Sequence, residues 1–221
     1  KGSVGAYSFA EAVLTSVQLG GVEPTSGIPY GYTLGVGAFA KSIVQSVNLS
    51  EGLTSLDAGC FYGSSISSIA IPDTTTRVGD YAFADCTNLS TVEIGTGLTE
   101  LSKFCFSNTA LSSVDIPMNI TTIKNNCFSD NLNLNQLTGA SNVLILGSDV
   151  FSNTGFVTAD HILDTFAGAT GGSGILSECS KLVSAKLSEN VSAIPSRAFE
   201  NSPNFSLLDL GGSHLDISIG S

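Results

Sequence analysis

A fixed interval of seventeen residues separates an aliphatic residue from a later phenylalanine along most of the chain. The interval recurs in six places: Val44 to Phe61, Ile66 to Phe83, Leu89 to Phe106, Leu111 to Phe128, Leu134 to Phe151 and Leu182 to Phe199. Self-similarity at a period of about 20 to 30 residues is typical of a solenoid, in which each repeat buries its apolar face only against its neighbours. The sequence therefore predicts one elongated repeat domain over residues 1–221.

Each repeat begins with a segment that is typical of a half-buried strand. In Leu111–Pro117, apolar residues at the fourth and sixth positions alternate with polar ones, which is the period of a strand with one buried face. Such segments begin near residues 14, 44, 66, 89, 111, 134, 156, 182 and 205, so most repeats are 22 or 23 residues long. We expect about nine repeats with one short parallel strand each, and turns or short helical segments on the opposite side.

Two repeats are longer than the others and predict inserted loops. The longer steps are 30 residues after position 14 and 26 residues after position 156. The first insertion falls near residues 20–36, which are rich in Gly, Pro and Tyr, and the second near residues 167–174. Insertions in repeats normally form loops on one face. The second contains a glycine-rich run without the lysine of a phosphate-binding loop, so we interpret it as a flexible insertion.

The charge balance limits the classes of partner. The net charge is -11, and the chain contains only 8 Lys and Arg residues. Binding to nucleic acid or to an anionic membrane surface requires clustered Lys and Arg, so neither is expected, and a partner steered by charge should be basic. No apolar run is long enough to cross a membrane, which needs about 18 residues or more.

The 5 cysteines follow the repeat. Cys60, Cys105 and Cys127 directly precede the periodic phenylalanine, while Cys86 and Cys179 lie where a repeat closes. We interpret them as small buried hydrophobic residues. A disulfide between Cys105 and Cys127 of neighbouring repeats is the alternative.

The run from Ile66 to Cys86, ISSIAIPDTTTRVGDYAFADC, resembles the repeat consensus of the BspA-like leucine-rich repeats of bacterial surface proteins. The shared features are an LxxIxIP strand, an aliphatic-glycine pair and an AF-xx-C closure, and the resemblance covers nearly the whole chain. It implies a leucine-rich repeat solenoid with a curved sheet, a cell-surface or secreted location, and attachment to a host or bacterial surface protein. The chain begins at the tail of one repeat and stops just before another would close, which predicts a fragment of a longer protein.

Few residues could carry catalysis or bind a metal. The 2 histidines, His161 and His214, lie in no recognisable motif. We interpret His161 as a structural residue of an irregular repeat, because no second His or Cys stands at the spacing of a metal ligand. We predict no catalytic residue, no metal site and no cofactor.

The exposed side of the strands is where we expect binding. Its side chains form two polar columns, one rich in hydroxyls and one acidic, with these candidate residues: Gln18, Asn48, Ser68, Thr91, Glu93, Ser113, Asp115, Thr158, Asp160, Lys186 and Asp209. Glu93 and Asp115 fall on adjacent strands, so their carboxylates could attract a cation or a Lys- or Arg-bearing peptide. The alternative is a surface that is polar only for solubility.

The pattern favours a non-catalytic protein-binding or adhesion module of a bacterial cell-surface protein. One alternative is a polysaccharide-degrading enzyme on a parallel β-solenoid, which would use Glu93 and Asp115. Such enzymes have several strands in each coil and aromatic subsites, whereas one strand and one phenylalanine column per repeat are visible here. The other alternative is a structural spacer for another surface domain.

Overall fold

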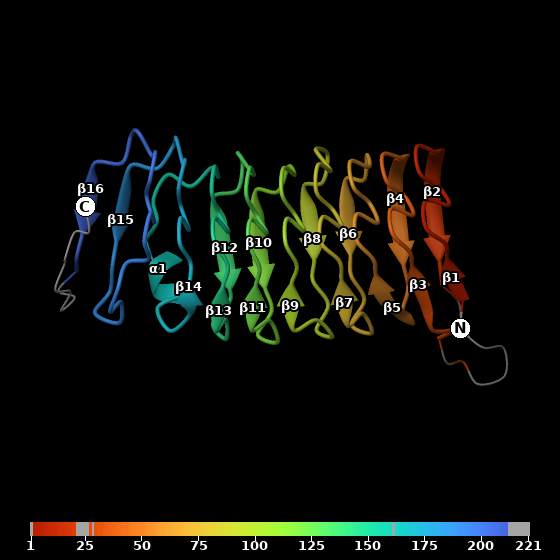
Figure 1. Ribbon diagram of the computed structural model, residues 1–221. Coiled ribbons are helices and arrows are strands. Elements are labelled where there is room, and N and C mark those ends of the chain that lie inside the picture. The colour runs from red at the N-terminus through yellow and green to blue at the C-terminus, as the bar shows by residue number, and fades with distance from the viewer. Residues whose placement is uncertain (1, 21–26, 28, 161, 212–221) are drawn as a thin grey trace.

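The protein is a solenoid of stacked coils, with β1 and β16 at opposite ends of the stack (Figure 1). The computed structural model describes residues 2–20, 27, 29–160 and 162–211. The predicted solenoid of short parallel strands is confirmed, and helix is confined to the single turn α1 (Ile162–Thr165) in the described part of the chain.

The predicted strands form the first of two strand columns. This column comprises β2 (Val13–Leu19), β4 (Ile43–Leu49), β6 (Ser68–Ala70), β8 (Thr91–Glu93), β10 (Ser113–Ile116), β12 (Gln136–Gly139), β15 (Ser184–Lys186) and β16 (Leu207–Asp209). The strands pair in parallel as β2-β4, β6-β8, β10-β12 and β15-β16. Their registers align equivalent repeat positions, such as Val114 with Leu137. We call the outward-facing side chains of this column the polar face.

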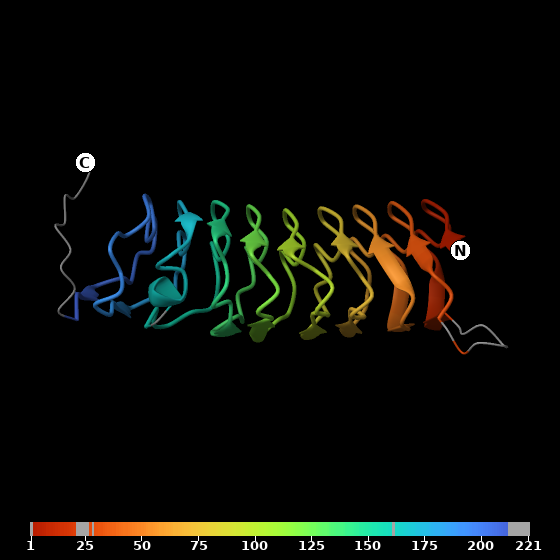
Figure 2. The same ribbon diagram turned by 90° about the horizontal axis from the view of Figure 1, so that it is seen from below.

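A second strand column runs along the opposite side of the coils (Figure 2). It comprises β1 (Gly2–Val4), β3 (Tyr32–Leu34), β5 (Leu53–Leu56), β7 (Arg77–Val78), β9 (Glu100–Leu101), β11 (Thr122–Ile123), β13 (Ile145–Leu146) and β14 (Thr170–Gly171). The sequence analysis did not predict it, because two-residue strands carry too little alternation to be recognised. Hydrogen-bonded strands on both sides keep similar spacings, and the row of coils is straighter than the curved sheet that the resemblance implies.

The periodic phenylalanines form a continuous stack in the core. The rings of Phe39, Phe61, Phe83, Phe106, Phe128 and Phe151 are fully buried. Successive centroids lie between 5.2 and 5.5 Å apart, with nearly parallel planes. All five cysteines are buried and free, so no Cys105–Cys127 bridge is formed. The interpretation of the cysteines as small core residues is confirmed.

Each phenylalanine lies at the centre of a turn with a repeated backbone conformation. The residues two positions before and two positions after it have positive φ, as in Tyr81 (φ 58) and Asp85 (φ 59) around Phe83. The left-handed conformation costs an L-residue about 1 to 2 kcal/mol, whereas glycine, and to some extent Asn and Asp, adopt it readily. Main-chain hydrogen bonds join neighbouring turns, for example from the N–H of Phe83 to the carbonyl of Cys105 (2.9 Å).

The repeat after Phe151 departs from this plan. Leu176 stands in the closing position, and Phe166 directly after α1 supplies the ring that packs against Phe151 (6.0 Å between centroids). Within the predicted insertion 167–174, Thr170 and Gly171 pair with β13 as strand β14, because the extra residues are taken up just before them. In the other predicted insertion, 20–36, Tyr32–Leu34 likewise belongs to the second strand column, and residues 21–26 and 28 lie outside the described residues.

Candidate functional site

All eleven predicted site residues are exposed and lie along the polar face. Gln18 pairs with Asn48 between β2 and β4, and Ser68 pairs with Thr91 between β6 and β8. Lys186 pairs with Asp209 between β15 and β16. The candidates therefore form a row along the solenoid and do not converge on one point.

Glu93 and Asp115 are not joined across a hydrogen-bonded ladder. Glu93 pairs with Ala70 in the β6-β8 sheet, while Asp115 pairs with Thr138 in the separate β10-β12 sheet. The Thr138 hydroxyl donates to the Asp115 carboxylate at 2.5 Å, so Asp115 already has a partner on the strand beyond it. The expected two-carboxylate site is not assembled as a ladder pair.

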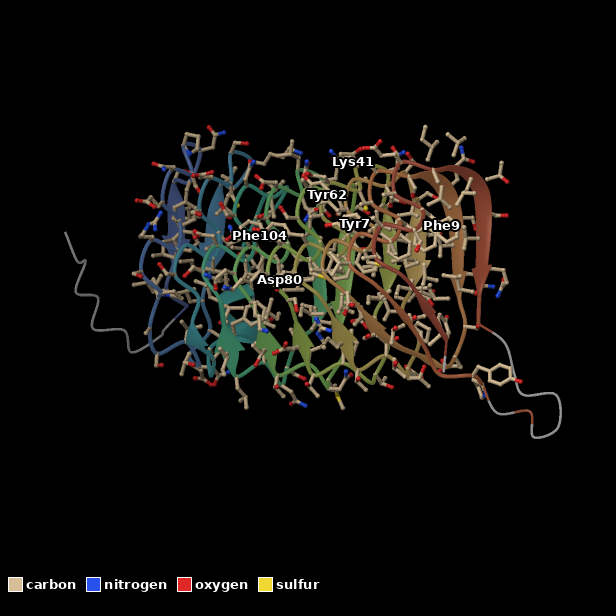
Figure 3. The ribbon with its side chains drawn as sticks, turned by 45° about the vertical axis from the view of Figure 1, so that its right-hand side comes forward. Tyr7, Phe9, Lys41, Tyr62, Asp80 and Phe104 are labelled. Carbon is tan, nitrogen blue, oxygen red and sulfur yellow. The ribbon has the colours of Figure 1, made fainter. Side chains whose placement is uncertain are left out.

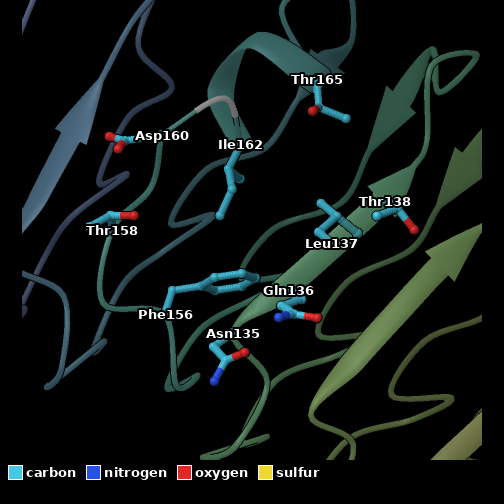
Figure 4. Close-up of a pocket in the computed structure, with 9 residues that line it drawn as sticks. All are labelled: Asn135, Gln136, Leu137, Thr138, Phe156, Thr158, Asp160, Ile162 and Thr165. Carbon is cyan, nitrogen blue, oxygen red and sulfur yellow. The ribbon is translucent and has the colours of Figure 1, made fainter.

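The polar face is hollowed where the segment 156–160, between β12 and β15 in the first strand column, forms no strand (Figure 4). A cavity of about 310 Å³ lies there, and we call it the sheet-break cavity. Its lining consists of Asn135, Gln136, Leu137, Thr138, Phe156, Thr158, Asp160, Ile162 and Thr165. Two of the predicted residues, Thr158 and Asp160, are thus brought together with polar side chains of β12. A smaller hollow of about 130 Å³ lies over β6 and β8 and brings together the predicted residues Ser68, Thr91 and Glu93.

The cavity follows from the local sequence. The segment 156–160 forms no strand and bonds toward β15: Val183 N–H donates to Val157 O and Ala159 N–H donates to Ser184 O, both at 2.8 Å. Ala159 is fully buried at a position where most repeats have Val, Ile or Leu. The small side chain leaves space that a branched residue would fill. A shift of the segment toward β15 and a small buried residue together open the face beside β12.

The lining combines an apolar floor with polar walls. Leu137, Phe156 and Ile162 supply hydrocarbon surface, and Asp160 is the charged side chain among the nine lining residues. Ligand pockets are commonly about 300 to 1,000 Å³ and pair apolar lining with a few placed polar groups. A lysine or arginine side chain suits this arrangement, because its stem packs on apolar surface while its cation meets a carboxylate.

The structure shows no metal-binding arrangement in the described part of the chain, where no three His, Cys, Asp or Glu side chains are grouped to hold an ion. His161 and His214 lie outside the described residues. No helix of the described ranges is long and apolar enough to cross a membrane.

Sequence analysis missed an aromatic surface on the turns that hold the phenylalanine stack. It comprises Tyr7, Tyr62 and Phe104, which Figure 3 labels, and Tyr81, which stacks on Phe104. We call it the aromatic row. The eleven predicted site residues of the polar face include no aromatic residue. The available signal was position, because Tyr7, Tyr81 and Phe104 each lie two residues before a periodic phenylalanine.

Comparison with known proteins identifies a repeat family. The model of the BspA type leucine rich repeat region matches in overlapping segments, residues 2–134, 54–167 and 132–219. No curated protein matches the chain.

Two solved structures show the same fold at low identity. A leucine-rich repeat protein from Bacteroides ovatus is 22% identical with a TM-score of 0.73, and the match covers 93% of this chain and 58% of that one. A leucine rich cell surface protein from Faecalibacterium prausnitzii is 20% identical with a TM-score of 0.57, covering 95% of this chain and 63% of that one. The chain thus spans less than two thirds of each of these relatives.

Proposed function

Because the chain belongs to the BspA-type leucine-rich repeat family, we propose that it is a non-catalytic protein-binding or adhesion module of a bacterial cell-surface protein. The polar face receives the partner, which is a host or bacterial surface protein. The sheet-break cavity is the anchoring point, and the remaining polar residues widen the contact. The cell-surface protein of Faecalibacterium prausnitzii with the same fold supports the location.

The observation that carries this proposal is the sheet-break cavity itself. It opens where the segment 156–160 forms no strand, and it contains Thr158 and Asp160, which the repeat pattern marks as exposed and polar. Protein interfaces gain most of their affinity from a few anchor side chains that fill desolvated pockets. A recess in a flat, rigid face provides such a pocket.

A basic partner fits the charge of the molecule. The net charge of -11 favours association with positively charged surfaces through long-range steering. Asp160 then fixes one cation locally within the cavity. Lys186, on the neighbouring strand β15, repels other cations. A basic partner should therefore present its cations on the β12 side of the cavity.

A polysaccharide-degrading activity is less well supported than protein binding, although the number of strands in each coil does not count against it. The coils contain two strand columns and the turns carry aromatic residues, so the strand number no longer separates this chain from catalytic solenoids. Glycoside hydrolysis by the common mechanism needs two carboxyl groups on either side of the scissile bond. Glu93 and Asp115, the predicted pair, belong to separate sheets, and Asp115 is bonded to Thr138.

Adhesion of the labelled protein to epithelial and bacterial cells tests the proposal. Asp160→Asn should weaken binding about thirtyfold or more, since truncating one partner of a charge pair that is buried in the complex costs about 2 kcal/mol or more. The matched control Glu11→Gln removes the same charge from the turn between β1 and β2, at the other end of the solenoid, and should bind like the wild type. Protease treatment of the cells should abolish binding by the wild type. Equal binding by both variants, or binding that survives the protease, would contradict the proposal.

A further inference from the structure

The aromatic row exposes large rings on a surface that the proposed protein-binding face does not use. Tyr7 is 63% exposed and Tyr81 is 44% exposed, while Tyr62 and Phe104 are half-buried. Tyr7, Tyr62 and Phe104 lie on the side that holds the phenylalanine stack (Figure 3). Tyr81 lies in the turn around Phe83. These rings are not needed to fill the core, which the buried phenylalanines already occupy.

Three of these rings stand where the backbone disfavours them. The position two residues before the periodic phenylalanine is left-handed, and Tyr7, Tyr81 and Phe104 adopt φ values of 55, 58 and 54. Other coils place Gly37, Gly59, Asn126, Asp149, Gly174 or Arg197 there. Bulky residues in this region are uncommon, and strained residues persist where function or surrounding contacts require them. Packing does not account for Tyr7, since most of its surface is exposed.

The rings leave one open place between them. A Cβ atom on Gly37 would overlap the ring of Tyr7, so that ring lies over the next coil. Tyr81 stacks on Phe104 with centroids 4.8 Å apart and planes within 5°, so its other ring face is turned toward Gly59. A Cβ on Gly59 would contact the Cβ of Tyr62 at 3.6 Å. Gly59 lies on the coil between the one that the Tyr7 ring covers and the one that carries Tyr81, with Tyr62 beside it. We call the surface over Gly59 the slot.

The polar groups around the slot are balanced in charge. The Tyr62 hydroxyl bonds to the Asp85 carboxylate, and this bond and the negative charge raise the pKa of Tyr62 above its ordinary value. Asp85 also accepts from Asn108 Nδ2 at 2.8 Å, and Asp80 accepts from the N–H of Lys103 at 3.1 Å. The exposed Lys41 adds a donor. These hydrogen-bond donors and acceptors are paired, and neither positive nor negative charge predominates. They therefore suit a neutral ligand with many hydroxyl groups.

The backbone of these turns argues against a peptide ligand. The N–H groups of Gly59, Phe61, Tyr81 and Phe83 all donate to carbonyls of the next coil, at 2.8 to 2.9 Å. A peptide that adds as a strand needs unpaired main-chain groups along an edge. The surface therefore offers ring faces and polar side chains to a ligand, and no main-chain ladder.

We propose that the aromatic row binds a neutral oligosaccharide, with a sugar ring held over Gly59 between the rings of Tyr7 and Tyr81. The apolar face of the sugar stacks on the aromatic rings. Its hydroxyls exchange hydrogen bonds with Tyr62, Asp85 and Lys41. Successive sugar units then follow the row toward Phe104.

Calorimetric titration with three neutral hexasaccharides, of β-1,4-linked glucose, α-1,4-linked glucose and β-1,4-linked N-acetylglucosamine, tests this site. We expect the wild type to bind at least one of them. The triple variant Tyr7→Asn, Tyr81→Asn, Phe104→Asn should lose about tenfold or more in affinity. Its melting temperature should be unchanged or higher, because Asn suits the left-handed position. Rings with a purely structural role would instead lower the melting temperature.

Three single variants complete the test. Gly59→Asn keeps a tolerated backbone and fills the slot without removing a ring, so it should also abolish binding. Asp149→Asn occupies the same position outside the aromatic row and should bind like the wild type. Asp160→Asn should keep its glycan affinity, which separates this site from the proposed protein-binding face. No binding of any hexasaccharide by the wild type, or undiminished binding by both the triple variant and Gly59→Asn, would overturn the proposal.

Discussion

The cysteines of this chain are buried side chains of the core, and their burial opposes ionisation of the thiols. Burial raises the pKa of Cys105 and of Cys127 well above the ordinary value. Desolvation likewise raises the pKa of the Cys86 thiol from 9.0 to about 11, although hydrogen bonds with Ser64 oppose the shift. The Cys86 thiol also donates to the carbonyl of Phe61 at 3.0 Å. Because thiolate is the reactive form, these residues should be inert in the native protein.

The shift at Cys86 predicts a loss of stability in alkali. The pKa of the Cys86 thiol is higher in the folded than in the unfolded protein. The contribution of this thiol to the free energy of unfolding is therefore fully present below pH 9 and is lost between pH 9 and about 11. The loss should reach about 2 to 3 kcal/mol. Urea unfolding of the wild type and of Cys86→Ala at pH 8 and pH 10.5 measures it. The variant should show a smaller decline, and equal declines would refute a buried, neutral thiol.

At the residue scale, the buried cysteines could be predicted from the sequence, whereas the left-handed turn residues could not. The cysteines recur beside the periodic phenylalanine, so their burial could be predicted from the repeat alone. The left-handed turns could not, because Tyr7, Tyr81 and Phe104 are residue types that this conformation disfavours. The aromatic row therefore becomes visible only when φ values and exposed ring surfaces are known together.

At the scale of elements, the phenylalanine stack and two strand columns hold each coil. Every internal ring of the stack packs between two others, so stability depends on neighbours, as in other repeat proteins. The first strand column alternates over enough residues to be predicted. The second contributes mostly two-residue strands, which are too short to show an alternation that sequence could reveal.

Removing a ring from the middle of the stack should cost far more than removing the phenylalanine of a later coil that lies outside the stack. Phe106 is fully buried between Phe83 and Phe128, so Phe106→Ala should lower the free energy of unfolding by about 3 to 5 kcal/mol. Phe199 is only half-buried and stacks on Phe205. Phe199→Ala should therefore cost less than half as much. Chemical denaturation of both variants measures the difference, and equal losses would be inconsistent with a continuous stack.

At the scale of the whole molecule, the regular coils and the irregular coil have different roles. The repeat gives a rigid scaffold with a polar face, and the departure between β12 and β15 gives that face a cavity. The sequence placed Thr158 and Asp160 on the face and identified their repeat as irregular. It could not show that the segment moves toward β15, because that shift depends on hydrogen bonds between coils.

The central claim is that a protein partner contacts the polar face at the sheet-break cavity. Photo-crosslinking on cells tests it directly, with a photoreactive amino acid placed at Thr158 on the cavity or at the exposed Lys103 on the turn side. The Thr158 probe should become linked to a cell-surface protein, and the additional Asp160→Asn substitution should remove that product. The Lys103 probe should yield no such product. Capture of the same protein from Lys103 but not from Thr158 would contradict the claim.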